Sequence, residues 1–199
     1  GPPSHRFGSR FARMGRLPPG SDALHAVGVG ERGPICVSYL SCALGDGVLA
    51  IQARCAANLV HHLIRERNVD PDDLILVGHG LGGVVALLSG ALCEDVGGIV
   101  SGSSLGCFQF LAEEENVTWP SAAFLPDVLK VLDLPEVVRA LAPCQVRIWD
   151  PQDAGRRSLS AGEARALYAP AGDHVRIVPG CLSDEEALKQ VAHLMERWA

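Results

Sequence analysis

A strand-to-helix turn is the part of this sequence best suited to chemistry. The segment Gly78-His79-Gly80-Leu81-Gly82-Gly83 lies between an apolar, β-prone run at residues 74–77 and a helix-prone run at residues 81–92. In parallel α/β folds, ligands bind beyond the carboxyl ends of the strands. The glycines of this turn allow two interpretations of what it binds.

The first interpretation is a dinucleotide-binding loop, because the turn matches G-x-G-x-x-G. That fingerprint needs an acidic residue at the end of the next strand, about 20 positions further on, to hold the ribose. Here the next strand ends in Ser101-Gly102-Ser103-Ser104, and Asp95 precedes that strand. A dinucleotide-binding, Rossmann-like domain is therefore the second alternative.

The other interpretation is a nucleophile elbow, G-x-S-x-G, in which a strained turn presents a serine hydroxyl above the sheet. Gly80 occupies the nucleophile position, so the turn has the required glycines and lacks the serine. A glycine offers no hydroxyl that could attack an ester carbonyl. The N–H of Leu81 would supply one half of an oxyanion hole, and His79 is a candidate binding residue.

A rival nucleophile occurs one strand later, where Gly102-Ser103-Ser104-Leu105-Gly106 is itself G-x-S-x-G. Ser104 would follow a strand at residues 98–101 and precede a helix at residues 107–114. The opposing interpretation is a loop whose serine hydroxyls bond to nearby backbone groups.

Two longer stretches resemble a known family. Residues 69–88, VDPDDLILVGHGLGGVVALL, are similar to the elbow region of α/β-hydrolase esterases. Residues 122–154, AAFLPDVLKVLDLPEVVRALAPCQVRIWDPQDA, resemble the later half of bacterial acetylxylan-esterase-type hydrolases. The resemblance covers residues 22–178 and implies an α/β-hydrolase fold with nucleophile, acid and histidine in that order.

The resemblance also implies which residues complete the site. It assigns the acid to Asp153, with Asp150 as the alternate and as a further binding candidate, and the histidine to His174. A histidine oriented by a carboxylate can act as a general base without a covalent nucleophile. The opposing interpretation is that Asp153 and His174 keep only a structural hydrogen bond.

Strands and helices that would position these residues alternate along the chain. β-prone runs lie at residues 23–29, 74–77, 98–101, 146–149 and 175–178, and helical patterns lie at residues 48–67, 81–92 and 184–198. This alternation predicts a three-layer α/β/α sandwich with a mainly parallel sheet. We expect an N-terminal arm or remnant at residues 1–21 and one domain at residues 22–199, with a cap insertion at residues 108–143.

The N-terminal side lacks a recognisable source for the second oxyanion donor. No strand and loop of that kind can be identified before Asp22. The sheet is therefore either reduced on this side or completed by a segment outside this chain. Self-association that covers an exposed sheet edge is the third option.

Composition excludes several function classes. The 199 residues carry a net charge of −6 without a basic stripe, so we expect no nucleic-acid partner. The uncharged run at residues 74–93 is long enough to span a membrane, but its central glycines divide it, so we expect no membrane span. Seven cysteines occur without a CxxC pair, so we expect no metal or other cofactor, and free thiols favour a cytoplasmic location.

These observations predict an esterase-related domain without an elbow serine. It would serve as a catalytically impaired binding or assembly module for a small ester or carbohydrate-derived ligand. The alternative is an active carboxylic or carbohydrate ester hydrolase that uses Ser104 or a water molecule activated by His174.

Overall fold

The computed structural model describes residues 45–93, 96–178 and 180, together with the single residues 41, 185, 186, 189 and 192. The predicted arm at residues 1–21 and the predicted strand at residues 23–29 lie outside the described residues. The predicted helix at residues 184–198 lies almost wholly outside them.

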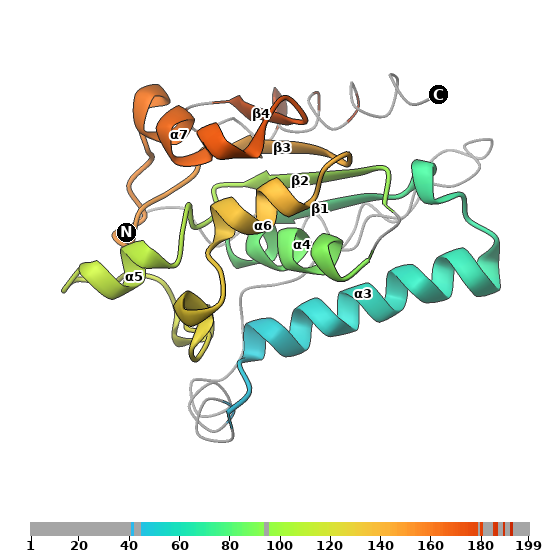
Figure 1. The fold of residues 1–199 in the computed structure, drawn as a ribbon, viewed down its shortest axis with the longest axis horizontal. Coiled ribbons are helices and arrows are strands. Elements are labelled where there is room, and N and C mark those ends of the chain that lie inside the picture. Colours follow the sequence, from blue (N-terminus) through green and yellow to red (C-terminus); the bar gives the residue numbers. More distant parts are fainter. Residues whose placement is uncertain are drawn as a thin grey trace.

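Four parallel strands form the sheet, in the order β1-β2-β3-β4 (Figure 1). Their bounds are Ile75–His79, Gly98–Gly102, Gln145–Trp149 and Val175–Val178. All three strand pairs are parallel, so all four carboxyl ends lie at one edge of the sheet. The prediction of an α/β fold with a parallel sheet is confirmed.

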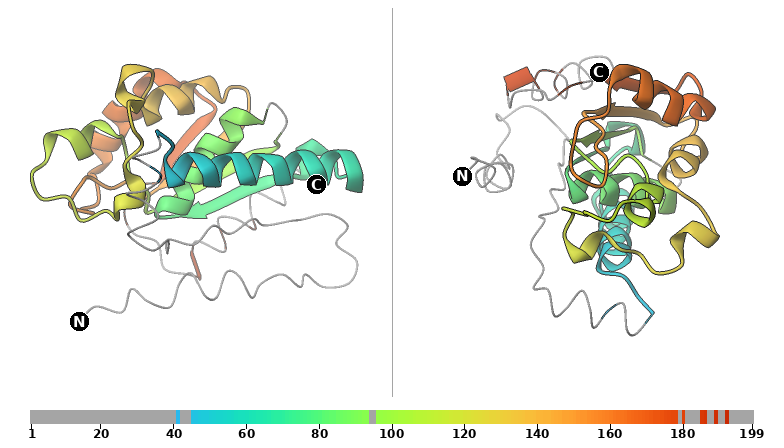
Figure 2. Two further views of the ribbon diagram at one scale, coloured as in Figure 1. Left: turned by 90° about the horizontal axis from the view of Figure 1, so that it is seen from below. Right: turned by 90° about the vertical axis from the view of Figure 1, so that its left-hand side faces the viewer.

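With the exception of α5 (Gln109–Glu113), the helices labelled in Figure 1 cover one face of this sheet (Figure 2). The two long ones, α3 (Val48–Arg67) and α4 (Leu81–Leu92), have the bounds that the sequence predicts. The shorter ones are α5 (Gln109–Glu113), α6 (Leu134–Ala140) and α7 (Ala161–Tyr168). Short 3-10 turns are η1 (Pro71–Asp73), η2 (Ser121–Ala123), η3 (Val128–Lys130) and η4 (Ala169–Ala171).

The core lies between the helices and one face of the sheet. Successive strand residues point to opposite faces, so Leu76, Ile99 and Val146, which are register partners across β1, β2 and β3, share a face. They belong to one buried cluster with Leu87 of α4 and Val138 of α6. Burying a large apolar side chain contributes about 1.5–3 kcal/mol, so these contacts fix α4 and α6 on the sheet.

A second contact joins the two long helices. The hydroxyl of Ser89 in α4 donates to the carbonyl of Ala53 in α3 at 3.1 Å, and it also bonds to the carbonyl of Val85 at 2.6 Å. Ser89 is fully buried. Helix α4, which begins at the predicted elbow, is therefore held by the sheet and by α3.

The predicted cap segment, residues 108–143, divides into two parts. Helix α6 is part of the layer over the sheet, because Leu134 and Val138 are fully buried. Helix α5 and the turns η2 and η3 lie beyond the carboxyl edge of the sheet (Figure 1). This second part alone occupies the place that a cap would need, and its role as a cap stays a prediction.

Candidate functional site

A residue with positive φ follows each of the first three strands. Gly80 follows β1 with a φ of 60°, Ser103 follows β2 with a φ of 43°, and Asp150 follows β3 with a φ of 50°. Residues other than glycine rarely adopt positive φ, and such strained positions cluster at functional sites. The carboxyl edge of β1, β2 and β3 is therefore the candidate site.

The turn between β1 and α4 has the tight geometry of an elbow. Gly80 has φ 60° and ψ −127°, and its N–H donates to the carbonyl of Gly102 at 2.8 Å. A Cβ on Gly78 would lie 2.0 Å from the carbonyl oxygen of Gly82, so only glycine fits there. The turn places Gly80 at its apex, and this residue has no side chain that could act as a nucleophile.

The first turn of α4 supplies hydrogen-bond donors at this apex. The N–H of Gly83 bonds to the carbonyl of Gly80 at 3.1 Å, whereas no described residue accepts from the N–H of Leu81 or Gly82. The N–H groups in the first turn of a helix carry partial positive charge. They suit a carbonyl oxygen or an anion, which is the role predicted for Leu81.

Asp150 is a buried carboxylate with one free oxygen. It is 1% exposed, and its Oδ2 accepts from Ser103 Oγ at 2.7 Å and from Gln152 Nε2 at 3.0 Å. Its Oδ1 receives no hydrogen bond. A buried polar atom without a partner costs stability and calls for a functional explanation. Asp150 therefore lies just after β3 with one buried acceptor atom that has no partner.

Asp153, the residue that the resemblance assigns as the acid, binds Arg157 in the structure. Its Oδ2 lies 2.9 Å from Nε of Arg157 and its Oδ1 accepts from the N–H of the same residue at 2.8 Å. Its own carbonyl accepts from the indole N–H of Trp119 at 2.7 Å. Both carboxylate oxygens therefore close the loop at residues 153–157, and the alternate acid, Asp150, is the one at the strand end.

His174 does not reach the candidate site. It directly precedes β4, its Nε2 lies 2.9 Å from the carbonyl oxygen of Val138, and its own carbonyl accepts from Val146. Because the strands are parallel, His174 lies at the amino edge, whereas Gly80 lies at the carboxyl edge. The structure does not bring Asp153 and His174 together, because the histidine directly precedes β4 whereas Asp153 follows β3.

Ser104 cannot serve as the rival nucleophile in this structure. Its side chain is fully buried and its hydroxyl bonds to Ser101 Oγ at 2.7 Å. A Cβ on Gly83 would lie 2.8 Å from Cβ of Ser104, so the serine packs against the first turn of α4. Its neighbour Ser103 was not singled out from the sequence, because its φ of 43° and its hydrogen bond to Asp150 produce no sequence pattern.

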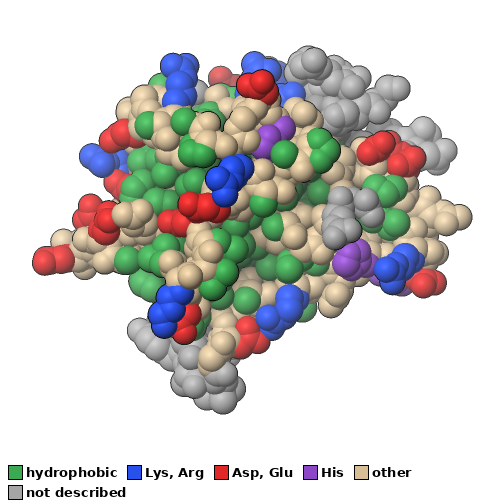
Figure 3. All heavy atoms as spheres, in the orientation of Figure 1, with side chains coloured by type: hydrophobic (Ala, Val, Ile, Leu, Met, Phe, Trp, Pro, Cys, Tyr) green, Lys and Arg blue, Asp and Glu red, His purple; other side chains and the backbone are tan. Residues whose placement is uncertain are grey.

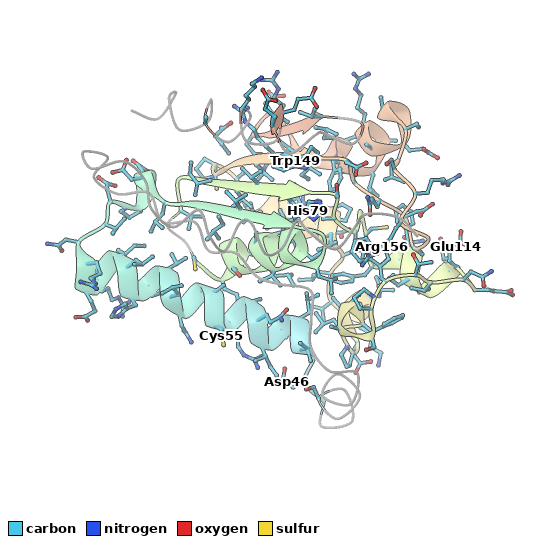
Figure 4. The ribbon with its side chains drawn as sticks, turned by 180° about the vertical axis from the view of Figure 1, so that it is seen from behind. Asp46, Cys55, His79, Glu114, Trp149 and Arg156 are labelled. Carbon is cyan, nitrogen blue, oxygen red and sulfur yellow. The ribbon has the colours of Figure 1, made fainter. Side chains whose placement is uncertain are left out.

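His79 lies beside Trp149 at the end of the sheet (Figure 4). The register pairs His79 with Gly102, and Gly102 with Trp149, so the three residues share one face. A Cβ on Gly102 would lie 2.1 Å from the indole nitrogen of Trp149, so the indole fills the space above that glycine. The exposed His79 therefore lies on the same face as the buried indole of Trp149, and it stays a candidate binding residue.

Cys107 is a nucleophilic side chain close to this edge, but it is not reactive. It is buried, and burial raises the pKa of its thiol to about 12, with the negative charge of Asp133 acting in the same direction. The thiolate is the reactive form of cysteine, so this thiol stays protonated and inert at neutral pH.

The part of the chain that the structure describes holds no group of three or more His, Cys, Asp and Glu side chains that could bind a metal ion. None of its helices is long and apolar enough to cross a membrane.

Comparisons with known proteins give structural neighbours alone, since no family model and no curated protein matches the sequence. A protein of Bacteroides fragilis assigned as an acetyl xylan esterase is 20% identical with a TM-score of 0.55, over 73% of this chain and 40% of that one. A carbohydrate esterase family 15 glucuronoyl esterase from Caldicellulosiruptor kristjansonii is 17% identical with a TM-score of 0.51, over 77% and 51%.

A third neighbour is a promiscuous esterase of the same family 15 from a marine bacterial metagenome. It is 16% identical with a TM-score of 0.51, over 85% of this chain and 54% of that one. The chain thus spans between 40% and 54% of the length of these three esterases. These likenesses, together with the parallel sheet and its flanking helices, show that the chain has an α/β-hydrolase-type fold.

Proposed function

We propose that this chain is an esterase-related domain that binds a small ester or carbohydrate-derived ligand and forms no acyl-enzyme at its elbow. One observation carries the proposal. Gly80 holds the strained backbone conformation at the apex of the turn and has no hydroxyl to place there. Without that oxygen, acyl transfer through a serine at the elbow is excluded, while the binding groups around it are retained.

Two kinds of group at the carboxyl edge support binding. The N–H groups of Leu81 and Gly82 suit a carbonyl or carboxylate oxygen of a ligand. The free Oδ1 of Asp150 suits a hydroxyl or N–H of the same ligand. One strand separates β1 from β3, so at about 4.8 Å per strand the two groups lie roughly 10 Å apart. That separation matches a ligand of the size of one sugar ring with an attached ester.

The neighbouring proteins support the same ligand class, since their names describe esterases that act on acetyl xylan and on glucuronoyl esters. An active hydrolase is the competing function. Neither route predicted for it is favoured, because Ser104 is buried and His174 lies at the opposite edge.

The test compares the native chain with Gly80→Ser, Asp150→Asn and His174→Ala. Hydrolysis of 4-nitrophenyl acetate is measured for all four proteins, and thermal shifts are measured with methyl glucuronate and with acetylated xylobiose. We expect no turnover by the native chain, and a thermal shift that Asp150→Asn abolishes and His174→Ala leaves unchanged. Turnover by the native chain that is lost in Asp150→Asn would show an enzyme and overturn the proposal.

A further inference from the structure

Helix α3 carries an apolar stripe on the side that faces away from α4. Ile51, Cys55 and Leu59 follow one another at intervals of four residues, so they lie along one side of the helix. Ile51 and Leu59 are 38% and 41% exposed, and Cys55 is exposed as well. Figure 4 shows Cys55 on the side of α3 that points away from the sheet. This α3 stripe therefore leaves apolar surface in contact with water.

Charged groups of opposite sign lie at the two ends of α3. Asp46 directly precedes the N-terminal cap Gly47, and its Oδ2 lies 2.6 Å from Nη2 of Arg54. The last turn carries Arg65 and Arg67, and basic side chains lie over it on the surface (Figure 3). Arg65 follows Arg54 by eleven residues, which is about three helical turns, so both lie on the same flank of the stripe. Such a helix is complementary to a copy of itself that runs in the opposite direction.

We propose that the α3 stripe is the contact surface of a dimer, in which the α3 helices of two copies pack antiparallel about a two-fold axis at Cys55. Residues at equal distances from the axis face each other, so Ile51 of one copy packs on Leu59 of the second copy. Asp46 and Arg65 lie nine residues before and ten residues after Cys55, so a carboxylate meets a guanidinium at both ends of the contact. The two helix dipoles are opposed, which adds to the attraction.

Counter-charges accompany the like charges that this arrangement brings together. Arg54 directly precedes Cys55, so the Arg54 side chains of the two copies lie on one flank of the contact. Each of them is paired with Asp46 of its own chain. Glu66 lies opposite the start of α3 in the second copy, where the N–H groups of the first turn carry partial positive charge. The charges of α3 therefore favour the antiparallel direction.

The size of the contact predicts a weak dimer. Helix α3 has 20 residues and is therefore about 30 Å long. One pair of helices of this length buries less surface than the roughly 1,600 Å² of a standard interface. We expect a dimer with a Kd of about 1–100 µM that dissociates on dilution. The contact does not involve the elbow or the ligand proposed for it, so it stands apart from the proposed function.

Sedimentation equilibrium of the full chain, with a reductant present, measures this association. Leu59→Asp places a charge in the stripe, and Leu129→Asp in the turn η3 is the matched control, since the two leucines are 41% and 48% exposed. We expect a monomer–dimer equilibrium for the native chain, at least tenfold weaker association of Leu59→Asp, and a change below twofold for Leu129→Asp. Circular dichroism checks that both variants keep the native helix content. A native chain that stays monomeric up to about 1 mM, or equal weakening in both variants, overturns the proposal.

Disulfide trapping tests the direction of the two helices. Diamide, which takes up two electrons and two protons, should join Cys55 of two copies, and peptide mass spectrometry identifies the cross-linked pair. In a Cys55→Ser background, chains with Ile51→Cys and chains with Leu59→Cys are then oxidised separately and as a mixture. Equal positions would be displaced by about 12 Å along the helix, which is farther than a disulfide spans, so only the mixture should link position 51 to position 59. Links between equal positions, or no link in the mixture, overturn the antiparallel pairing.

Charge reversal tests the two ends of the contact. Arg65→Glu turns the attraction to Asp46 of the second copy into repulsion and should weaken association about threefold. Arg67→Glu is the matched control, because residue 67 is rotated by about 200° from residue 65 and lies on the other side of α3. This control should change the Kd by less than twofold. Equal effects of the two changes would overturn the pairing of Asp46 with Arg65.

Discussion

Gly78→Ala tests how tightly the strand and helix of the elbow are packed. A Cβ at this position would lie 2.0 Å from the carbonyl oxygen of Gly82, 2.2 Å from its carbonyl carbon and 2.5 Å from the nitrogen of Gly83. All three are backbone atoms, so no side chain can rotate to relieve the overlap. The first turn of α4 would have to move away from β1.

The expected cost follows from that geometry. Overpacking a core usually costs about 1–3 kcal/mol, and the rigid backbone contacts place Gly78→Ala at about 3 kcal/mol or above. For a chain of this length, 1 kcal/mol shifts the melting temperature by about 2–4 °C, so the variant should melt at least about 6–12 °C lower. The total stability of such domains is about 5–15 kcal/mol, which leaves most of the protein folded.

The matched control is Gly162→Ala. Gly162 lies in α7, and a Cβ there would have no atom within 4 Å. Alanine has the higher helix propensity, so this change should stabilise the protein by up to about 1 kcal/mol. Urea denaturation of both variants measures the free energies of unfolding. A loss below about 0.5 kcal/mol for Gly78→Ala, or an equal loss in both variants, would refute the close packing of the elbow.

Two further predictions concern buried polar groups. Ser89→Ala removes the hydroxyl that joins α4 to Ala53 of α3, so the free energy of unfolding measured by urea denaturation should fall by about 1 kcal/mol. An unchanged denaturation midpoint would contradict a stabilising role of this hydrogen bond. Burial raises the pKa of Cys144 to about 11 and that of Cys107 to about 12, so both stay protonated at pH 8. Peptide mass spectrometry after iodoacetamide treatment should therefore show that the exposed Cys55 is alkylated at least tenfold faster than Cys107 and Cys144 at pH 8. The difference between these alkylation rates should become smaller as the pH rises. Equal alkylation rates at pH 8 would contradict burial of Cys107 and Cys144.

The long elements could be predicted from the sequence because their signals are local. The apolar residues Leu49, Ala53, Ala56 and Val60 recur every three or four positions and are the buried face of α3. The glycines after residue 77 interrupt an apolar run, and the structure places a turn there. Such patterns need no knowledge of what packs against them.

Helix α7 shows what periodicity alone misses. It has eight residues, of which only Ala164 and Tyr168 are buried, so its apolar stripe is too short to recognise. The start of α7 could have been predicted, because Ser160 and Glu163 form a capping box. The hydroxyl of Ser160 accepts from the N–H of Glu163, and the Glu163 carboxylate accepts from the N–H of Ser160. These hydrogen bonds lower the pKa of the Glu163 carboxyl. The position of α7 in the fold could not be predicted from the sequence, because it depends on the hydrogen bond from the Tyr168 hydroxyl to the carbonyl of Gly106, which is distant along the chain.

The site residues divide in the same way. The sequence by itself determined the glycine-rich turn between β1 and α4, because such a turn depends on neighbours along the chain, and it determined that Gly80 carries no hydroxyl. Only the tertiary structure decided that Asp150 and not Asp153 carries the free carboxylate oxygen, and that His174 lies at the far edge. The physical reason is that strand direction and inter-strand register decide which side chains meet, and neither is encoded in the spacing of residues along one segment.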